Sequence, residues 1–480
     1  MNWATADKSS GRRFLLWGVL VVLVGYGFPW DLQGAAEQGQ APVAPAGEIA
    51  VALKQVPVWE LAGPRVRDLF LRGHYIALRP ERPPDVEYPD LTSGAPLYGE
   101  AQFDDGGQRL SFRLALARSR PEGDYDLFYF DDNRDADLTN DAPRKPSQEM
   151  TGRLARRSLP IKETYFESVQ VPFDFGLAGR QTDELLPCLQ SYPGNHPQIS
   201  LVAAHVHAGE FQVDGTSCQA FLGYQYAVRG RLDQPTTTLI LALRGDEPVS
   251  WWYGNRLNAL HLLGRRYYRF SGTPTGDTLT VRPYDGPLGA FEIGAGGRKV
   301  EKLTVCGALS SQESAVAVGG ELEGGRPAPA RQCRIPVGDY YPVIVEVEMA
   351  DLRITISNNY NTSAQGQPRG REPLCGIAIR ADKPYVLDFS NKPVVLFEQP
   401  KAEVRVHPGD EVKISAMLVD PVLDIVVRGL IDTTRTRTQI LRTVDGKEFA
   451  LPNRPWSFDP NVVIRRANGE IVAEGVMPFG

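Results

Sequence analysis

Val343-Ile344-Val345-Glu346-Val347-Glu348-Met349 alternates apolar and charged side chains over its second half. Similar runs with a period of two occupy residues 110–116 and 278–282. Such alternation is typical of β-strands, because successive side chains point to opposite faces of a sheet. Long stretches with a helical period are hard to find, and only a short helix is expected, near residues 66–70. These patterns predict an all-β protein.

Turn signals between the runs point to β-sandwiches. Asp214-Gly215, Asp445-Gly446 and Asn468-Gly469 suit type I′ turns, in which both central residues have a positive φ angle. The chain has 47 glycines and 38 prolines among its 480 residues, which fits many short strands joined by tight turns. We therefore expect tandem β-sandwich domains.

The length predicts two to four domains, and the composition suggests where they divide. We expect a signal peptide or signal anchor over residues 1–36, a linker over 37–49, and a β-rich domain over 50–265. A β-sandwich over 266–400 and a C-terminal Ig-like sandwich over 401–480 follow. Ile335-Pro336-Val337-Gly338-Asp339-Tyr340-Tyr341 resembles the strand entry of prealbumin-like and carboxypeptidase-regulatory-like modules, and residues 404–416 resemble an Ig-like opening.

The N-terminus has the pattern of an export signal. Arg12 and Arg13 precede residues 14–30, which carry no charge, and Gly34-Ala35-Ala36 follows. This predicts either cleavage after Ala36 or an uncleaved anchor formed by residues 14–30. In both cases the bulk of the chain is expected outside the cytoplasm: periplasmic, secreted or anchored in the inner membrane. The formal charge of −6 gives no reason to expect nucleic acid as a partner.

Five cysteines would lie in a compartment where disulfides persist. Their order suggests pairing of Cys188 with Cys218 and of Cys306 with Cys333, and leaves Cys375 over. The alternative is that all five are small apolar residues of the core.

An Asp-rich loop is the one chemically specific element. Counting from Asp131, oxygen-bearing side chains stand at positions 1, 3, 5, 7, 9 and 11. Calcium prefers six to eight oxygen ligands, so this spacing predicts a Ca²⁺ site. Its expected ligands are Asp131, Asn133, Asp135, Asp137 and Asp141. Five carboxylates within eleven residues would otherwise repel one another, with only Arg134 inside the run to offset them.

The loop resembles the Asp-x-Asn-x-Asp loops of EF-hand, dockerin and thrombospondin-type calcium repeats. Ala136 stands at position 6, where these loops have Gly, and a left-handed backbone there costs a non-Gly residue ~1–2 kcal/mol. Ala142 stands at position 12, where a bidentate acid is usual, so Asp141 or a distant residue must substitute. A bound ion is expected to brace the domain rather than to catalyse, and the alternative is a solvated acidic turn.

Two further groups could form sites. His205 and His207 lie on one face of an expected strand, which is the geometry of a metal-binding pair, with His196 or Asp214 as candidate third ligands. The alternative is a pair of structural histidines. Trp251-Trp252-Tyr253, with Tyr267-Tyr268 nearby, could form an aromatic platform for sugar rings, although such clusters are more often part of a core.

No signature of nucleophilic, zinc-protease or phosphate-binding chemistry is found in the chain. As a whole the sequence resembles the uncharacterised secreted β-sandwich proteins of planctomycete-like bacteria, a resemblance that implies no activity. The leading hypothesis is a non-enzymatic binding or scaffold protein that contacts a cell-envelope protein or polysaccharide, and the membrane itself if the N-terminal segment is uncleaved. The alternative is an extracytoplasmic polysaccharide-active hydrolase or carbohydrate-binding protein.

Overall fold

The computed structural model describes residues 47–477, apart from 62, 92–93, 106–107, 156–161, 192–196, 244–255, 312–313, 321, 324–325, 358–375, 401–404, 406, 408–409, 411 and 443–447. Within these residues the chain forms 32 strands, two α-helices and two 3-10 helices. The prediction of a mostly β protein is confirmed. The expected signal or anchor lies outside the described residues. No helix among those that are described is long and apolar enough to cross a membrane.

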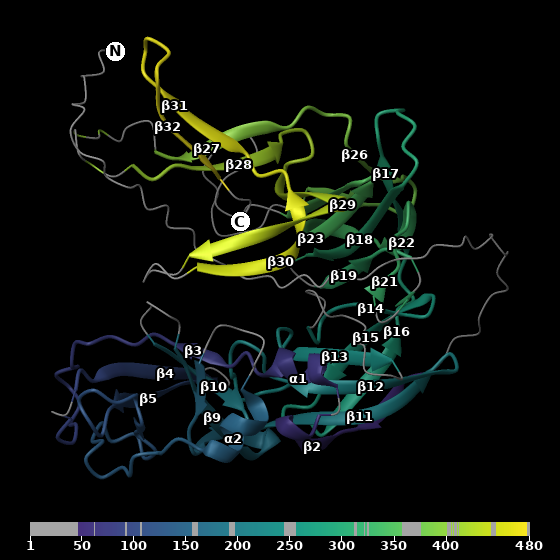
Figure 1. Cartoon of the computed structure of the whole chain (residues 1–480). Coiled ribbons are helices and arrows are strands. Elements are labelled where there is room, and N and C mark those ends of the chain that lie inside the picture. Colours follow the sequence, from purple (N-terminus) through teal and green to yellow (C-terminus); the bar gives the residue numbers. More distant parts are fainter. Residues whose placement is uncertain are drawn as a thin grey trace.

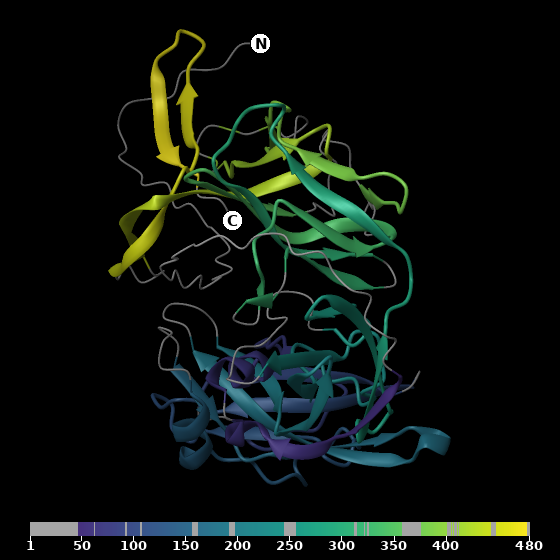
Figure 2. The same cartoon turned by 90° about the vertical axis from the view of Figure 1, so that its right-hand side faces the viewer.

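The first sixteen strands form four antiparallel sheets, which make up the lower body in Figures 1 and 2. They are β1 (Ile49–Ala52), β2 (Lys54–Pro57), β3 (His74–Ile76), β4 (Leu97–Asp105), β5 (Gln108–Ala117), β6 (Leu127–Phe130), β7 (Lys162–Tyr165), β8 (Val169–Asp174), β9 (Arg180–Ser191), β10 (Gln198–Ala203), β11 (His205–Val213), β12 (Thr216–Gly223), β13 (Thr238–Leu243), β14 (His261–Leu263), β15 (Arg266–Gly272) and β16 (Thr278–Pro283). The strand orders are β1-β16-β15-β14, β13-β12-β11-β2, β3-β10-β9-β7 with β8 also on β9, and β4-β5-β6.

The remaining strands form the upper body. They are β17 (Leu288–Gly294), β18 (Leu303–Ser310), β19 (Ala315–Val318), β20 (Leu322–Glu323), β21 (Arg326–Pro327), β22 (Gln332–Pro336), β23 (Gly338–Met349), β24 (Leu352–Ser357), β25 (Ile377–Ile379), β26 (Tyr385–Asp388), β27 (Val394–Gln399), β28 (Ser415–Asp420), β29 (Ile425–Arg442), β30 (Glu448–Ser457), β31 (Asn461–Arg465) and β32 (Ile471–Val476). A nine-stranded sheet runs in the order β19-β18-β23-β24-β29-β28-β27, with β25 on β23 and β30 on β29. Three smaller sheets are β22-β17-β26, β20-β21 and the hairpin β31-β32.

Two strand pairings join residues from either side of the expected domain divisions. β1 pairs with β16, which places residues on both sides of the expected division at 265 in one sheet. β24 pairs with β29, which does the same across residue 400. The four sheets of the lower body end with Pro283, and those of the upper body begin with Leu288. Composition shifts did not reveal these pairings, because the partners are far apart in the sequence.

The hairpin β14–β15 contributes to both hydrophobic cores. Tyr268 packs in the core of the lower body, whereas its neighbour Tyr267 packs in the core of the upper body. Since adjacent side chains of a strand point to opposite faces, one strand can bury an aromatic ring in each body. The Tyr268 hydroxyl donates to Asp214 Oδ2, and the Tyr267 hydroxyl donates to Ala317 O at 3.2 Å.

The helices are short and lie beside the lower body (Figure 1). They are η1 (Val58–Glu60), α1 (Pro64–Phe70), α2 (Gln148–Leu154) and η2 (Gly176–Ala178). The first α-helix confirms the one expected near residues 66–70. The second begins after Ser147, whose Oγ accepts from Met150 N at 3.2 Å and so caps the helix.

Of the three predicted type I′ turns, the one at Asp214-Gly215 is confirmed and the one at Asn468-Gly469 is wrong. The third, at Asp445-Gly446, lies outside the described residues. Asp214 and Gly215 both have positive φ angles, of 48° and 77°, as the expected type I′ turn between β11 and β12 requires. In the hairpin β31–β32 only Gly469 has a positive φ angle, so the type I′ expectation for Asn468-Gly469 is wrong. The Arg466 N–H donates to Glu470 O there, which closes a longer loop.

The expected disulfides do not form. Cys188 lies on β9 and Cys218 on β12, in different sheets and different core clusters, and they are not bonded to each other. Cys306 on β18 and Cys333 on β22 form no disulfide with each other. Cys375 lies outside the described residues.

Candidate functional site

The Asp-rich loop follows strand β6 directly, because the apolar run 127–130 ends at Asp131. Asp131 is 2% exposed. Its Oδ1 accepts from Asp135 N at 3.1 Å and its Oδ2 accepts from Ala136 N at 3.2 Å. The first carboxylate of the loop is therefore buried and held by the backbone of positions 5 and 6.

The following oxygen-bearing side chains bind the backbone in steps of two residues. Asn133 Oδ1 accepts from Asp135 N at 3.1 Å, Asp135 Oδ1 from Asp137 N at 2.9 Å, and Asp137 Oδ1 from Thr139 N at 2.9 Å. Asp135 Oδ2 also accepts from the amides of Asn133 and Asn140, at 2.8 and 2.9 Å. Repeated Asx turns of this kind give the loop its tight curvature.

The tight curvature of the loop strains the backbone at position 6. Ala136 has a φ angle of 62°, so the loop adopts the left-handed conformation that its spacing predicts. The loop is also pinned from outside: Glu87 N donates to Ala136 O at 2.8 Å, and Leu138 N donates to Glu87 O at 2.9 Å. Leu138 itself is fully buried in a small cluster with Tyr88 and Tyr129.

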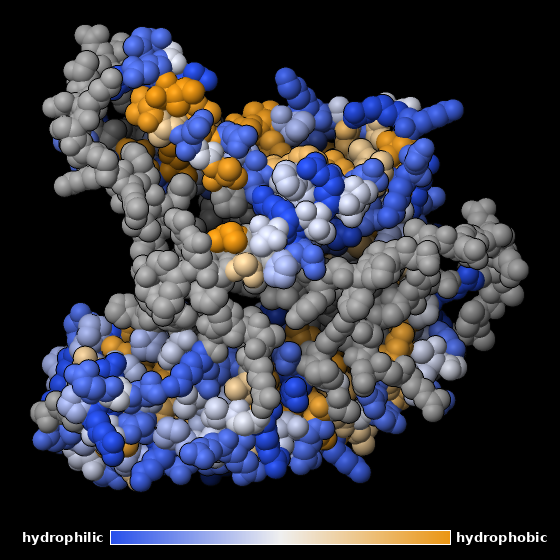
Figure 3. All heavy atoms as spheres, viewed as in Figure 1, coloured by the Kyte–Doolittle hydropathy of each residue, from blue (hydrophilic) through white to orange (hydrophobic). Residues whose placement is uncertain are grey.

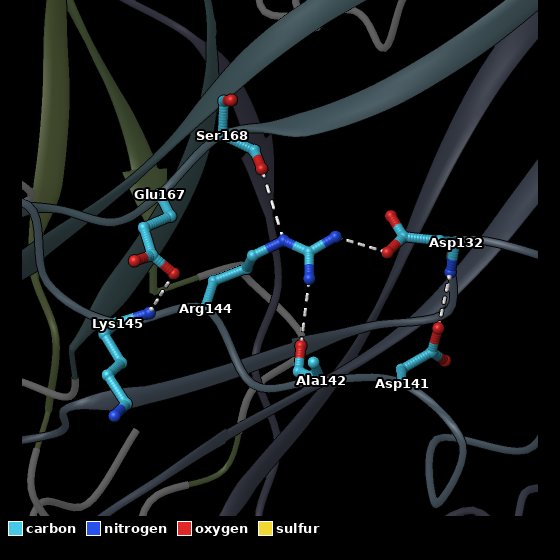
Figure 4. Close-up of polar contacts among 7 residues, drawn as sticks. All are labelled: Asp132, Asp141, Ala142, Arg144, Lys145, Glu167 and Ser168. Atoms are coloured by element: carbon cyan, nitrogen blue, oxygen red, sulfur yellow. Dashed lines mark hydrogen bonds and ion pairs between the residues drawn. The ribbon is translucent and has the colours of Figure 1, made fainter.

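The closing end of the loop contains an unsatisfied carboxyl oxygen. Asp132 pairs with the Arg144 guanidinium, which also donates to Ala142 O at 3.0 Å (Figure 4). Asp141 Oδ1 accepts from Asp132 N at 3.4 Å, but its buried Oδ2 has no hydrogen-bond partner among the described residues. Burial raises the pKa of Asp141 to about 6, and the carboxylates of Asp132, Asp131 and Asp135 add to this rise.

Several of the expected calcium ligands contact one another within the loop. Asp131, Asn133 and Asp135 are joined by hydrogen bonds, and the charge of Asp141 is affected by its acidic neighbours, whereas Asp137 is engaged by Thr139. No set of three His, Cys, Asp or Glu side chains in the described part of the chain is arranged to hold a metal ion as it stands. Calcium therefore stays a prediction.

A polar cavity of about 180 Å³ lies elsewhere in the lower body. It forms where the chain leaves one sheet for another: β10 pairs with β9 up to Ala203, and β11 begins at His205 on β2. The pairing of β10 with β9 ends at Leu185, so residues 180–184 of β9 pair with β8 alone. Strands that diverge in this way leave a gap between the sheets.

Asp183 is the most unusual residue in the wall of this cavity. It is 9% exposed, and it lies on the same face of β9 as the buried Leu185. The Gln181 side-chain amide donates to its Oδ1, but its Oδ2 has no donor among the described residues. Burial raises the pKa of Asp183 to about 6, although contacts with Gln181 and Tyr224 oppose the rise.

Tyr224 contacts Asp183 but does not satisfy it. The Tyr224 hydroxyl donates its single hydrogen to Gly230 O, so it has none left for the carboxylate. Burial, followed by the Asp183 carboxylate, raises the pKa of Tyr224 well above its ordinary value. The pair is therefore better satisfied when Asp183 is protonated and donates to the tyrosine oxygen.

The cavity also contains both residues of the expected histidine pair. His205 Nδ1 lies 3.8 Å from Glu184 Oε2, and all three of His205, His207 and Glu184 line the cavity. His207 is 7% exposed and its Nδ1 has no hydrogen-bond partner among the described residues. Burial lowers the pKa of His207, although the nearby Asp277 carboxylate opposes this, so the ring is neutral near pH 7.

The two candidate third ligands for the histidines were Asp214 and His196. Asp214 accepts from the Tyr268 hydroxyl, and His196 lies outside the described residues. Trp251, Trp252 and Tyr253, the expected sugar platform, also lie outside them. Tyr267 and Tyr268 are 3% and 1% exposed, so they belong to the cores and offer no surface to a sugar.

Sequence reasoning missed Asp183. The one signal is its position: it replaces an apolar residue on the inward face of a strand that continues with Leu185. A carboxylate at such a position must be paired, protonated or functional.

No protein-family model, curated protein or solved structure matches this chain. The class that the fold defines is a mostly antiparallel all-β protein with a polar cavity between its sheets.

Proposed function

We propose that this chain is an exported, non-enzymatic scaffold protein of the cell envelope that assembles with a second copy of itself. The distribution of exposed apolar side chains carries this proposal. Of the fifteen large hydrophobic side chains that are exposed in the described residues, twelve lie between Val386 and Val476. Figure 3 shows apolar surface gathered over the hairpin β31–β32, while polar colours dominate the lower body.

The hairpin β31–β32 is suited to adding strands from another chain. It forms a sheet of its own, and both of its edges lack a neighbouring strand among the described residues. A two-stranded hairpin is marginally stable alone, and free edges accept further strands. Val463, Val472 and Val476 are 42%, 52% and 52% exposed on it. Pairing with a second copy would bury these side chains and extend the sheet.

The charges of the hairpin do not oppose self-association. Arg466 pairs with Glu470 at 2.8 Å, and Arg465 and Glu474 add one charge of each sign. Sedimentation velocity of the full-length chain over a range of concentrations tests the proposal. Val463→Thr with Val472→Thr keeps strand propensity and removes apolar surface, so we expect at least tenfold weaker dimerisation. Val422→Thr, at a site 72% exposed outside the hairpin, is the matched control.

A chain that stays monomeric at all concentrations would refute self-assembly through the hairpin. Equal weakening by the hairpin variant and by Val422→Thr would show that exposed apolar surface in general, not the hairpin, drives association.

We further propose that calcium braces the Asp-rich loop. Asp131, Asn133, Asp135, Asp137 and Asp141 would supply the oxygen ligands. The observation that supports this is Asp141 Oδ2, which is buried without a donor and would gain a partner in a cation. Calorimetric titration of the full-length chain with calcium should show saturable binding that Asp135→Asn with Asp137→Asn removes.

The control for the titration is Asp285→Asn, which changes an exposed carboxylate paired with Arg266 outside the loop. No heat of binding, together with a melting temperature that a chelator leaves unchanged, would reduce the loop to an acidic turn.

We also propose that residues 14–30 direct export of the chain. The same proposal includes Ig-like or prealbumin-like sandwiches formed by the sheets. N-terminal sequencing of the protein recovered from the envelope would distinguish cleavage after Ala36 from an uncleaved anchor. A protein that keeps Met1 and is released from membranes by washing would contradict both cleavage after Ala36 and an uncleaved anchor.

A second candidate is a carbohydrate-binding protein, and the cavity is the observation that favours it. Asp183 and Glu184 are neighbours on one strand, whereas hydrolysis of a glycosidic bond uses two carboxyl groups that flank it. This arrangement favours binding over hydrolysis. Release of reducing sugar from envelope polysaccharide that Asp183→Asn abolishes would instead establish the hydrolase.

A further inference from the structure

The open groups of the cavity wall are hydrogen-bond acceptors. Asp183 Oδ2 and His207 Nδ1 are both buried without a partner among the described residues. Burial lowers the pKa of His207, and a neutral imidazole has one ring nitrogen that accepts a hydrogen bond. Two buried acceptors without donors cost stability, which suggests that a ligand supplies the donors.

The charge of the wall is negative. Asp183 and Glu184 both line the cavity, and Asp277 is close enough to influence His207. The residues that line the cavity, within the described part of the chain, include no Lys or Arg. A buried carboxylate is unfavourable unless a cation compensates it. Among the described residues that line the cavity, the His205 ring lies beside Glu184, with 3.8 Å between Nδ1 and Oε2.

The rest of the wall suits hydroxyl groups. Gln55, Gln170, Gln181 and Thr182 line the cavity, and each of these side chains both donates and accepts hydrogen bonds. The volume of about 180 Å³ compares with ~10–15 Å³ for one water. It therefore holds a ligand of roughly a dozen heavy atoms, which is the size of a hexosamine.

We propose that this cavity binds a small polyhydroxylated amine, of the size of an amino sugar, through its ammonium group. An ammonium carries three donors and no acceptor, which suits unpartnered acceptors such as Asp183 Oδ2 and His207 Nδ1. Its charge compensates the buried carboxylate, which a neutral sugar does not. Glu184 and His205, which are one-third exposed, stand where the cavity opens to solvent.

This inference goes beyond the proposed scaffold function and does not depend on it. The cavity, the Asp-rich loop and the hairpin β31–β32 share none of the residues invoked for them. Loss of dimerisation or of calcium binding would therefore leave this proposal standing, and the reverse also holds.

The test is a calorimetric titration of the full-length chain with glucosamine and with glucose, which differ by one ammonium group in place of one hydroxyl. We expect saturable binding of glucosamine and at least tenfold weaker binding of glucose. Asp183→Asn should weaken glucosamine binding at least tenfold without lowering the melting temperature. Glu210→Gln, on the exposed side of β11, is the matched control and should bind like the wild type.

Three results would overturn the proposal. Glucose that binds as tightly as glucosamine would show that the ammonium group is not recognised. Binding that survives Asp183→Asn and His207→Leu would place the ligand elsewhere. Saturable binding of Zn²⁺ that requires His205 and His207, with no binding of glucosamine, would make the cavity a metal site.

Discussion

Replacing Asp183 by Asn is expected to stabilise the protein at neutral pH. The pKa of Asp183 is raised from 3.8 to about 6 by burial in the folded protein. A carboxyl group whose folded pKa is raised stabilises the fold at low pH, and this contribution is lost as the pH rises from 3.8 through about 6. At ~1.36 kcal/mol per pH unit, ionised Asp183 costs the fold about 3 kcal/mol at pH 7.5. Asn avoids this cost, because its Oδ1 can accept from Gln181 and its Nδ2 can donate to the Tyr224 oxygen.

The assay is urea unfolding of the wild type and of Asp183→Asn at pH 4 and pH 7.5. We expect the free energy of unfolding of the variant, relative to the wild type, to increase by about 2 to 3 kcal/mol between the two pH values. A more stable variant that no longer binds glucosamine would show that Asp183 is retained for binding at the expense of stability. A relative stability that does not depend on pH would refute the assignment of Asp183 as a buried, strained carboxylate.

Three further predictions test other parts of the structure. Burial lowers the pKa of His261 from 6.5 to about 4. The neutral ring therefore stabilises the fold near pH 7, and this contribution falls by about 2 kcal/mol at pH 5. In urea unfolding, the free energy of unfolding should fall less between pH 7 and pH 5 for His261→Leu than for the wild type. Ala136→Gly should raise the free energy of unfolding by about 0.5 to 1 kcal/mol, because Gly adopts the φ angle of 62° without strain; a loss would show that the methyl group outweighs the strain. Tyr268→Phe should cost about 2 kcal/mol through the lost hydrogen bond to Asp214, and a double-mutant cycle with Asp214→Ala should assign most of that loss to the pair.

The Asp-rich loop shows how far local sequence reaches. Its curvature, the left-handed backbone at Ala136 and the oxygen atoms at alternate positions all follow from residues within one loop. What holds it in place does not: Leu138 is anchored in a cluster with Tyr88 and Tyr129, and Glu87 bonds the loop backbone from a distant segment. The raised pKa of Asp141 likewise depends on burial and on acidic neighbours that only the folded loop brings together.

The cavity, in contrast to the loop, could not be predicted from local sequence. His205 and His207 were recognisable as a pair two residues apart, but their surroundings were not. Glu184 and Asp183 reach them because β9 and β11 meet at the seam between two sheets. The acidic residue was hidden in a run that otherwise predicts a buried strand.

The sequence by itself determined that this is a β protein, with a short helix near residues 66–70, a type I′ turn at Asp214-Gly215 and an Asp-rich loop after a strand. These features depend on side-chain alternation and on the φ angles of adjacent residues, which are local properties of the chain. Only the tertiary structure decided that β1 pairs with β16, that β24 pairs with β29, and that two acceptors remain open in a cavity. The physical reason is that any strand with one apolar face can pair with many others. The choice among them is made by the joint burial of side chains from distant segments, which no local pattern records.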